Sequence, residues 1–149
     1  MIFMITILNI REAKQEQYDD VWAIVRYYRG RSDWIRQVIE LAPSQELWAK
    51  FQKLKVTGNW NDKTFKQIYV PRFLKEMQCQ TARAKLNELF SKDREGKSIA
   101  LVCFCADELL CHRSIIAGLL QGTGCHVKTS KGNDYSDYYK QYKIIEGIC

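Results

Sequence analysis

The sequence predicts an α/β domain in which a mostly parallel central sheet is flanked by helices. Three segments that are nearly continuous in apolar residues, at 1–10, 21–28 and 97–105, alternate along the chain with segments of helical period. Near-continuous apolarity, rather than strict alternation, indicates strands that are covered on both faces, as in a parallel sheet. Strands interleaved with helices predict a layered α/β arrangement.

The chain of 149 residues has the length of one domain, and no internal repeat, heptad array or linker interrupts it. We therefore expect a single α/β domain over residues 1–149. The longest apolar run, residues 99–105, is too short to span a membrane, and the N-terminus lacks the basic region and cleavage site of a secretory signal. These features favour a cytoplasmic protein without a membrane partner.

In the first half of the chain, we expect strands at Met1–Ile10, Val21–Tyr28 and, more weakly, Ile35–Leu41. From Ser44 the apolar period becomes helical, and Ser44 is placed to cap a helix that runs to about Lys55. Asp62 is placed to cap the next helix. Pro71 falls inside its apolar pattern and predicts a kink or break near Val70.

In the second half, the pattern predicts a helix from about Thr81 to Phe90, a strand at Lys97–Cys105 and a helix at Ser114–Gln121. A last short strand is expected at Cys125–Thr129. The tail from about residue 130 to 149 is rich in tyrosine and has no firm period.

The loop between the Lys97–Cys105 strand and the following helix carries the residues best suited to chemistry. In open α/β sheets, ligands bind beyond the carboxyl ends of the strands, and a helix start favours an anion. Cys111, beside this helix start and Arg113, is expected to have a lowered thiol pKa, while His112 exchanges protons near neutral pH. Cys111, His112 and Arg113 are therefore candidate catalytic residues. Neighbouring candidates for ligand contact are Cys105, Asp107, Glu108 and Ser114.

Other interpretations of these residues remain open. Cys103 is expected to be a protonated, buried apolar side chain, Arg113 can instead pair with Asp107 or Glu108, and His112 can donate to a backbone carbonyl. A cysteine-phosphatase loop requires arginine after five intervening residues, but Arg113 comes two positions late after Cys105.

The sequence does not favour a metal site. Cys103, Cys105, Cys111 and His112 have the ligand types for zinc, but paired CxxC spacing is absent and adjacent Cys111 and His112 are awkward co-ligands. We therefore expect no metal and no cofactor. The remaining cysteines do not imply a disulfide framework, and Cys79 and Cys149 look incidental.

The chain resembles the domain of unknown function 488 family over about residues 3–129. The specific match is a strand ending in Cys103, an acidic pair at Asp107 and Glu108, and the sequence Cys-His-Arg at 111–113. Arg26 matches an arginine that ends an early strand in the family, whereas Cys105 stands where the family often has glutamate. The resemblance implies an α/β domain in which Arg26 and the block 103–113 share one pocket.

Three functions remain open. The first, which we favour, is a small enzyme or sensor for a phosphorylated or nucleotide-like anion, although the residues do not establish turnover. The second is a nucleic-acid accessory protein, because the net charge is +6 and aromatic residues such as Trp48, Trp60 and the tail tyrosines can stack on bases. Scattered basic residues are, however, more typical of ordinary solvated surface. The third is a protein that only binds a small anion.

Overall fold

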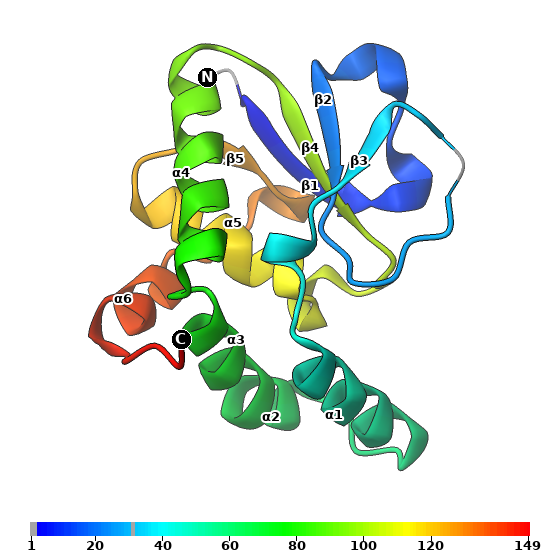
Figure 1. The fold of residues 1–149 in the computed structure, drawn as a ribbon, viewed down its shortest axis with the longest axis vertical. Helices are drawn as coiled ribbons and strands as arrows, with labels where there is room; N and C mark the ends of the chain where they lie inside the picture. Colours follow the sequence, from blue (N-terminus) through cyan, green and yellow to red (C-terminus); the bar gives the residue numbers. More distant parts are fainter. Residues whose placement is uncertain (1–2, 31) are drawn as a thin grey trace.

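A five-stranded, entirely parallel sheet forms the centre of the computed structural model, which describes residues 3–30 and 32–149 (Figure 1). Its strands are β1 (Ile5–Asn9), β2 (Asp20–Ala23), β3 (Ile35–Gln37), β4 (Ile99–Cys103) and β5 (Val127–Lys128). Their order is β3-β2-β4-β1-β5, and every neighbouring pair is parallel. The predicted fold class is confirmed.

The strands at the site end earlier than the apolar pattern suggests. β2 ends at Ala23 although Ile24 and Val25 stay buried, and β4 ends at Cys103 rather than Cys105. The third strand ends at Gln37 and is followed by a 3₁₀ turn at Ile39–Leu41. Apolar residues indicate which positions are buried, and here the buried positions continue beyond the last residues of the strands. The predicted first strand includes residues 1–2, which lie outside the described residues.

Helix α1 (Gln45–Val56) begins as predicted, with the Ser44 side chain accepting a hydrogen bond from the Leu47 N–H at 3.1 Å. The next helix is capped by Asn61 rather than Asp62. It consists of α2 (Asp62–Thr64), a π-helical turn (Phe65–Tyr69) and α3 (Val70–Glu76). At the position of the predicted break near Val70, the structure has a junction between the π-helical turn and α3. Pro71 lies in the first turn of α3, where a helix accommodates proline.

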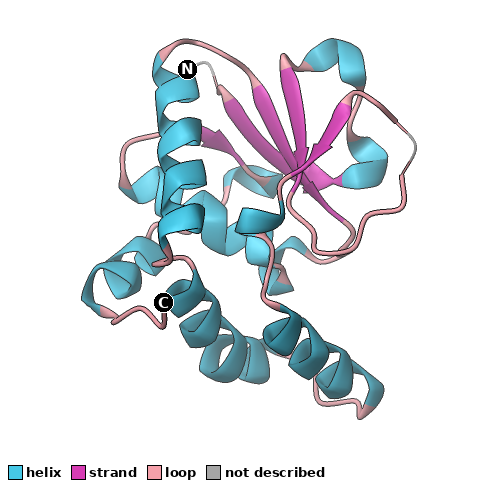
Figure 2. Cartoon of the chain, viewed as in Figure 1, coloured by secondary structure: helices cyan, strands magenta, loops and turns pink. Residues whose placement is uncertain are grey.

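Helices α4 (Gln80–Arg94) and α5 (His112–Gly122) complete the layers. α5 packs against β1, β4 and β5 and is buried over nearly its whole length. Figure 2 shows α1, α2 and α3 as an arm beyond the sheet, whereas α4 runs beside the strands. In the described part of the chain, no helix combines the length and apolar character required to cross a membrane.

The tyrosine-rich tail is folded onto the domain. It forms α6 (Asp137–Ile144), which packs against α5 and α3. A disulfide joins Cys79 to Cys149, so the interpretation of these cysteines as incidental is wrong. The Tyr142 hydroxyl also donates to the Met77 carbonyl at 2.8 Å, and these two links hold the tail beside the start of α4.

Gly118 of α5 allows this close packing, and its replacement tests the docking of the tail. A Cβ atom at Gly118 would lie 2.0 Å from the Tyr135 carbonyl oxygen. Alanine gains about 1 kcal/mol in helix propensity, but overpacking against backbone costs about 1–3 kcal/mol or more. We expect Gly118→Ala to lower the free energy of unfolding by about 1–2 kcal/mol, measured by urea denaturation.

The matched control is Lys50→Ala on the exposed face of α1, which we expect to change stability by at most about 0.5 kcal/mol. A Gly118→Ala protein as stable as its parent would show that the tail does not dock on α5 in this way.

Candidate functional site

A pocket of about 320 Å³ lies at the carboxyl ends of β2 and β4. One side is formed by the residues that follow these strands, and α1 and the π-helical turn close the other side. The pocket has a basic pair, Arg26 and Lys55, and an aromatic wall formed by Tyr27, Trp48, Phe51, Trp60 and Tyr69. Cys103, Cys105, Cys111 and His112, which we call the thiol–imidazole cluster, also line it.

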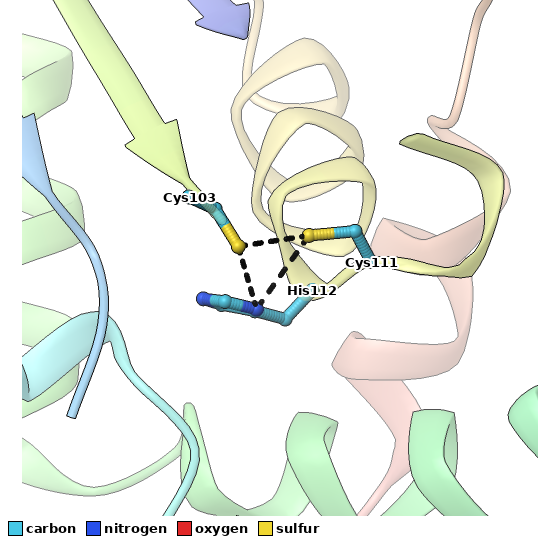
Figure 3. A group of neighbouring side chains, drawn as sticks. All are labelled: Cys103, Cys111 and His112. Atoms are coloured by element: carbon cyan, nitrogen blue, oxygen red, sulfur yellow. Dashed lines mark hydrogen bonds between the residues drawn. The ribbon is translucent and has the colours of Figure 1, made fainter. Parts of the chain in front are cut away.

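The thiol–imidazole cluster joins the end of β4 to the start of α5 (Figure 3). The Sγ atoms of Cys103 and Cys111 are 3.2 Å apart. His112 Nδ1 lies 4.0 Å from Cys103 Sγ and 3.8 Å from Cys111 Sγ. All three side chains are buried, so the end of the strand and the start of the helix present sulfur and imidazole to one enclosed point.

Cys105 joins the cluster because the strand stops at Cys103. Asn9, the partner of Cys103 in the β1–β4 register, donates from Nδ2 to the carbonyls of Phe104 and Cys105 at 3.3 and 3.1 Å. This turn brings the Cys105 Sγ atom to 3.5 Å from the Cys103 Sγ atom. Side chains two residues apart on one face of a regular strand are separated by about 6.6 Å, so the turn brings the two thiols closer together than a strand would.

His112 is oriented by a backbone carbonyl. Its Nε2 is hydrogen-bonded to the carbonyl of Ile24. Because a carbonyl only accepts, Nε2 carries the proton and Nδ1 faces the sulfur atoms. One interpretation of His112 from the sequence was that it donates to a backbone carbonyl. The structure shows this bond, and His112 is at the same time a member of the cluster.

Arg113 lies behind the cluster and does not line its pocket. Its Nη1 donates to the Cys105 carbonyl at 2.8 Å and to the Cys111 Sγ atom at 3.6 Å, and the residue is 3% exposed. Burial acts to lower the pKa of Arg113, but negative charge on the cysteine thiols outweighs it and raises that pKa. Arg113 therefore stays charged and supports negative charge on the cluster.

The thiol pKa values reverse the order expected from the sequence. Hydrogen bonds from the thiols of Cys105 and Cys111 hold the pKa of Cys103 well below its usual value. Burial raises the pKa of Cys111 well above the usual value. The hydrogen bond to Cys103 raises the pKa of Cys105 to about 12. The prediction of a lowered thiol pKa at Cys111 is wrong, because Cys111 is fully buried and its hydrogen bond stabilises negative charge on Cys103.

The other predicted site residues lie apart from the pocket. Ser114 is buried and donates to the Cys111 carbonyl at 2.7 Å. Asp107 accepts from the Leu109 N–H at 3.0 Å, and Glu108 accepts from the Ser130 N–H at 3.0 Å and the Tyr135 hydroxyl at 2.6 Å. Among the described residues, neither carboxylate forms a salt bridge with Arg113.

Arg26, by contrast, shares the pocket with the cluster, as the family resemblance implied. The contribution of α1 to the pocket was not predicted from the sequence. Trp48 and Phe51 share one face of the helix that the apolar period from Ser44 predicts, and Lys55 follows at helical spacing. In the structure this face is half-buried over the ends of the strands. The helical spacing could be recognised in the sequence, but the orientation of the helix relative to the sheet could not.

The fold and the site define a single-chain α/β protein with a thiol–imidazole cluster at the carboxyl edge of a parallel sheet. The chain belongs to the domain of unknown function 488 (DUF488) family: the family model DUF488-N3a, described as "Active DUF488-N3 subclade", matches residues 5–124. This confirms the resemblance drawn from the Cys-His-Arg block. Comparisons with curated proteins and with solved structures give no match.

The bonds of Glu108 predict that its carboxylate stabilises the fold. Tyr135→Phe removes one donor from a buried carboxylate, and we expect it to lower the free energy of unfolding by about 1–3 kcal/mol. Glu108→Gln should cost a similar amount, and the double variant should cost less than the sum because the two groups share one bond.

Urea denaturation of the three variants measures this coupling. Tyr138→Phe is the control, because its ring stacks on that of Tyr135 while Glu108 keeps its bond. If the losses of unfolding free energy from Glu108→Gln and Tyr135→Phe are additive, the two side chains are not coupled. Glu108 would then be available for ligand contact, as the sequence predicted.

Proposed function

We propose that this protein is a small enzyme that binds an anionic, ring-bearing ligand of nucleotide-like chemistry and acts on it at the thiol–imidazole cluster. One observation carries the proposal: a single pocket joins the basic pair, the aromatic wall and the cluster. Each of these parts is suited to a different portion of such a ligand.

The size and the walls of the pocket support a small planar ligand. About 320 Å³ is near the lower end of the range for small-molecule pockets, which begins at about 300 Å³. The Tyr27 and Trp48 rings meet edge to face at 4.8 Å, and Phe51 and Trp60 meet in the same way at 4.6 Å. Aromatic faces arranged around a narrow space favour a flat ring, which can stack on them.

The basic pair supports a negative charge on that ligand. The Arg26 Nε atom donates to the Pro43 carbonyl at 2.7 Å, which fixes the guanidinium while its other N–H groups stay able to contact a ligand. The Lys55 ammonium lies 5.1 Å from the centre of the Phe51 ring, on the side wall of the pocket. A planar guanidinium with a second cation in the lining of the same pocket suits a phosphate or carboxylate.

The cluster favours an enzyme over a protein that only binds. Recognition of a ring and an anion needs the walls and the basic pair alone, whereas three sulfur atoms and an imidazole beside the same cavity supply reactive groups. The nucleic-acid alternative relied on scattered basic residues, with Trp48, Trp60 and the tail tyrosines as stacking surfaces. Of these aromatic residues, the two tryptophans line the pocket.

Ligand binding is tested with adenosine monophosphate and inorganic phosphate as probes. Arg26→Ala should weaken binding of adenosine monophosphate by about 5–100-fold, since one charged hydrogen bond contributes about 1–3 kcal/mol. Tryptophan fluorescence is the readout, because Trp48 and Trp60 lie in the wall.

Arg29→Ala is the matched control, because it removes the same charge from the same loop at a residue outside this pocket. Equal affinities for the parent and Arg26→Ala would contradict the proposed anion site. Turnover is then tested with nucleoside and sugar phosphates by mass spectrometry of the products. A ligand that binds but is never converted would leave only a binding protein, and a steep salt dependence of binding to DNA or RNA would favour the nucleic-acid alternative.

A further inference from the structure

We propose that Cys103, Cys111 and His112 together bind one zinc ion through Cys103 Sγ, Cys111 Sγ and His112 Nδ1, with the fourth coordination position facing the pocket. This inference deepens the proposed function, and it rests on that function only for the use of the fourth position. It also reverses the expectation from sequence that the chain holds no metal.

The three ligand atoms already have nearly the spacing of a tetrahedral site. With Zn–S near 2.3 Å and Zn–N near 2.05 Å, a tetrahedron has S···S edges of about 3.8 Å and S···N edges of about 3.6 Å. The structure has 3.2 Å between the two sulfur atoms, and 4.0 and 3.8 Å from Nδ1 to the sulfur atoms of Cys103 and Cys111. Shifts of about half an ångström would complete the geometry.

The imidazole is oriented as a ligand. Its Nε2–H donates to the Ile24 carbonyl, and this leaves Nδ1 on the side of the ring that faces the sulfur atoms (Figure 3). Metal-bound histidines in general donate their second ring N–H to a carbonyl, carboxylate or water, which fixes the ring and its tautomer. This bond is already present in the structure.

The local backbone explains how adjacent residues serve as co-ligands. Cys111 has extended dihedral angles, φ −127° and ψ 143°, and is the N-cap of α5, whereas His112 is its first helical residue. The change from extended to helical backbone between them turns both side chains to the same point (Figure 3). Adjacent residues are awkward co-ligands when both lie in one regular helix or strand. Cys111 and His112 instead lie on either side of the boundary between extended backbone and α5.

Charge balance supports a divalent ion at this place. Two thiolates neutralise Zn²⁺, so the ion and its ligands are neutral together in a buried environment. Arg113 donates to the Cys111 Sγ atom from behind, at 3.6 Å. Sulfur and imidazole ligands suit zinc better than magnesium or calcium, which prefer oxygen.

The fourth position distinguishes a catalytic site from a closed structural one. Within residues 3–30 and 32–149, the one group of three or more residues with metal-ligating side chains whose ligand atoms all lie within 4.8 Å of one another is Cys103, Cys111 and His112, and Cys105 falls outside it. All three ligands line the pocket. A site with two cysteines, one histidine and one open position is of the catalytic type, in which zinc polarises a bound water or ligand oxygen.

The experiment measures metal binding by the full chain with no organic ligand present. Protein purified without chelators should contain about one zinc per chain by elemental analysis. After removal of the metal under reducing conditions, Co²⁺ should bind with equal stoichiometry and give thiolate charge-transfer and tetrahedral visible bands. Cys103→Ser and Cys111→Ser should each weaken Co²⁺ binding by at least about 100-fold, since even outer partners of a metal contribute about 10–100-fold.

Cys125→Ser is the matched control, because Cys125 is a buried free cysteine outside the cluster, and its variant should bind Co²⁺ as the parent does. Cys105→Ser should also keep the full stoichiometry and a tetrahedral spectrum. Circular dichroism confirms that each variant is folded, and the measurement on the parent requires no substitution.

Absence of zinc and of any cobalt spectrum in the parent would overturn the proposal, as would a folded Cys111→Ser protein that binds Co²⁺ as the parent does. Loss of metal in Cys105→Ser would overturn the open fourth position. Titration of the metal-free parent with adenosine monophosphate keeps the two proposals separate. A parent that binds the nucleotide but no metal would overturn the zinc site alone, and one that binds zinc but no anionic ligand would overturn the proposed ligand alone.

Discussion

The parallel pairing of β4 with β1 on one side and β2 on the other determines where the pocket of this protein lies. Every residue of β4 is buried, and its neighbours fix its register from both sides, from Ile5 opposite Ile99 to Asn9 opposite Cys103. Because all strands are parallel, their carboxyl ends meet at one edge. The residues that follow β2 and β4 must therefore meet there, and the pocket forms between them and α1.

The end of β4 converts this register into a site. In a strand that continued to Cys105, the side chains of Cys103 and Cys105 would share one face but lie about 6.6 Å apart along it. Asn9 prevents this by binding the carbonyls of Phe104 and Cys105 with its side chain. One amide on the neighbouring strand thus ends the ladder at Cys103 and turns the chain toward α5, which begins at His112.

The sequence predicted the parts of this structure that local chemistry determines. Parallel strands follow from apolar runs, and the start of α1 follows from the Ser44 side chain. The edge where the site lies follows from the loop after β4. The cap at Asn61 was missed because Asp62 has the same capping chemistry one residue later. The α1 wall, the Cys79–Cys149 link and the metal geometry depend on contacts between distant segments, which no local period reports.

The position of Arg113 changes how the anion site must be understood. A guanidinium that is 3% exposed, with an Nε atom that has no hydrogen-bond partner in the described part of the chain, is costly to bury unless negative charge lies nearby. Its contacts are the Cys105 carbonyl and the Cys111 sulfur, and both of these acceptor atoms carry partial negative charge whether or not the sulfur binds a metal ion. Arg113 is thus a counter-ion of the protein's own sulfur atoms. In the proposed function, Arg26 and Lys55, which line the pocket, bind the external anion. Arg113 thus interacts with the cluster, and two separate cations interact with the ligand.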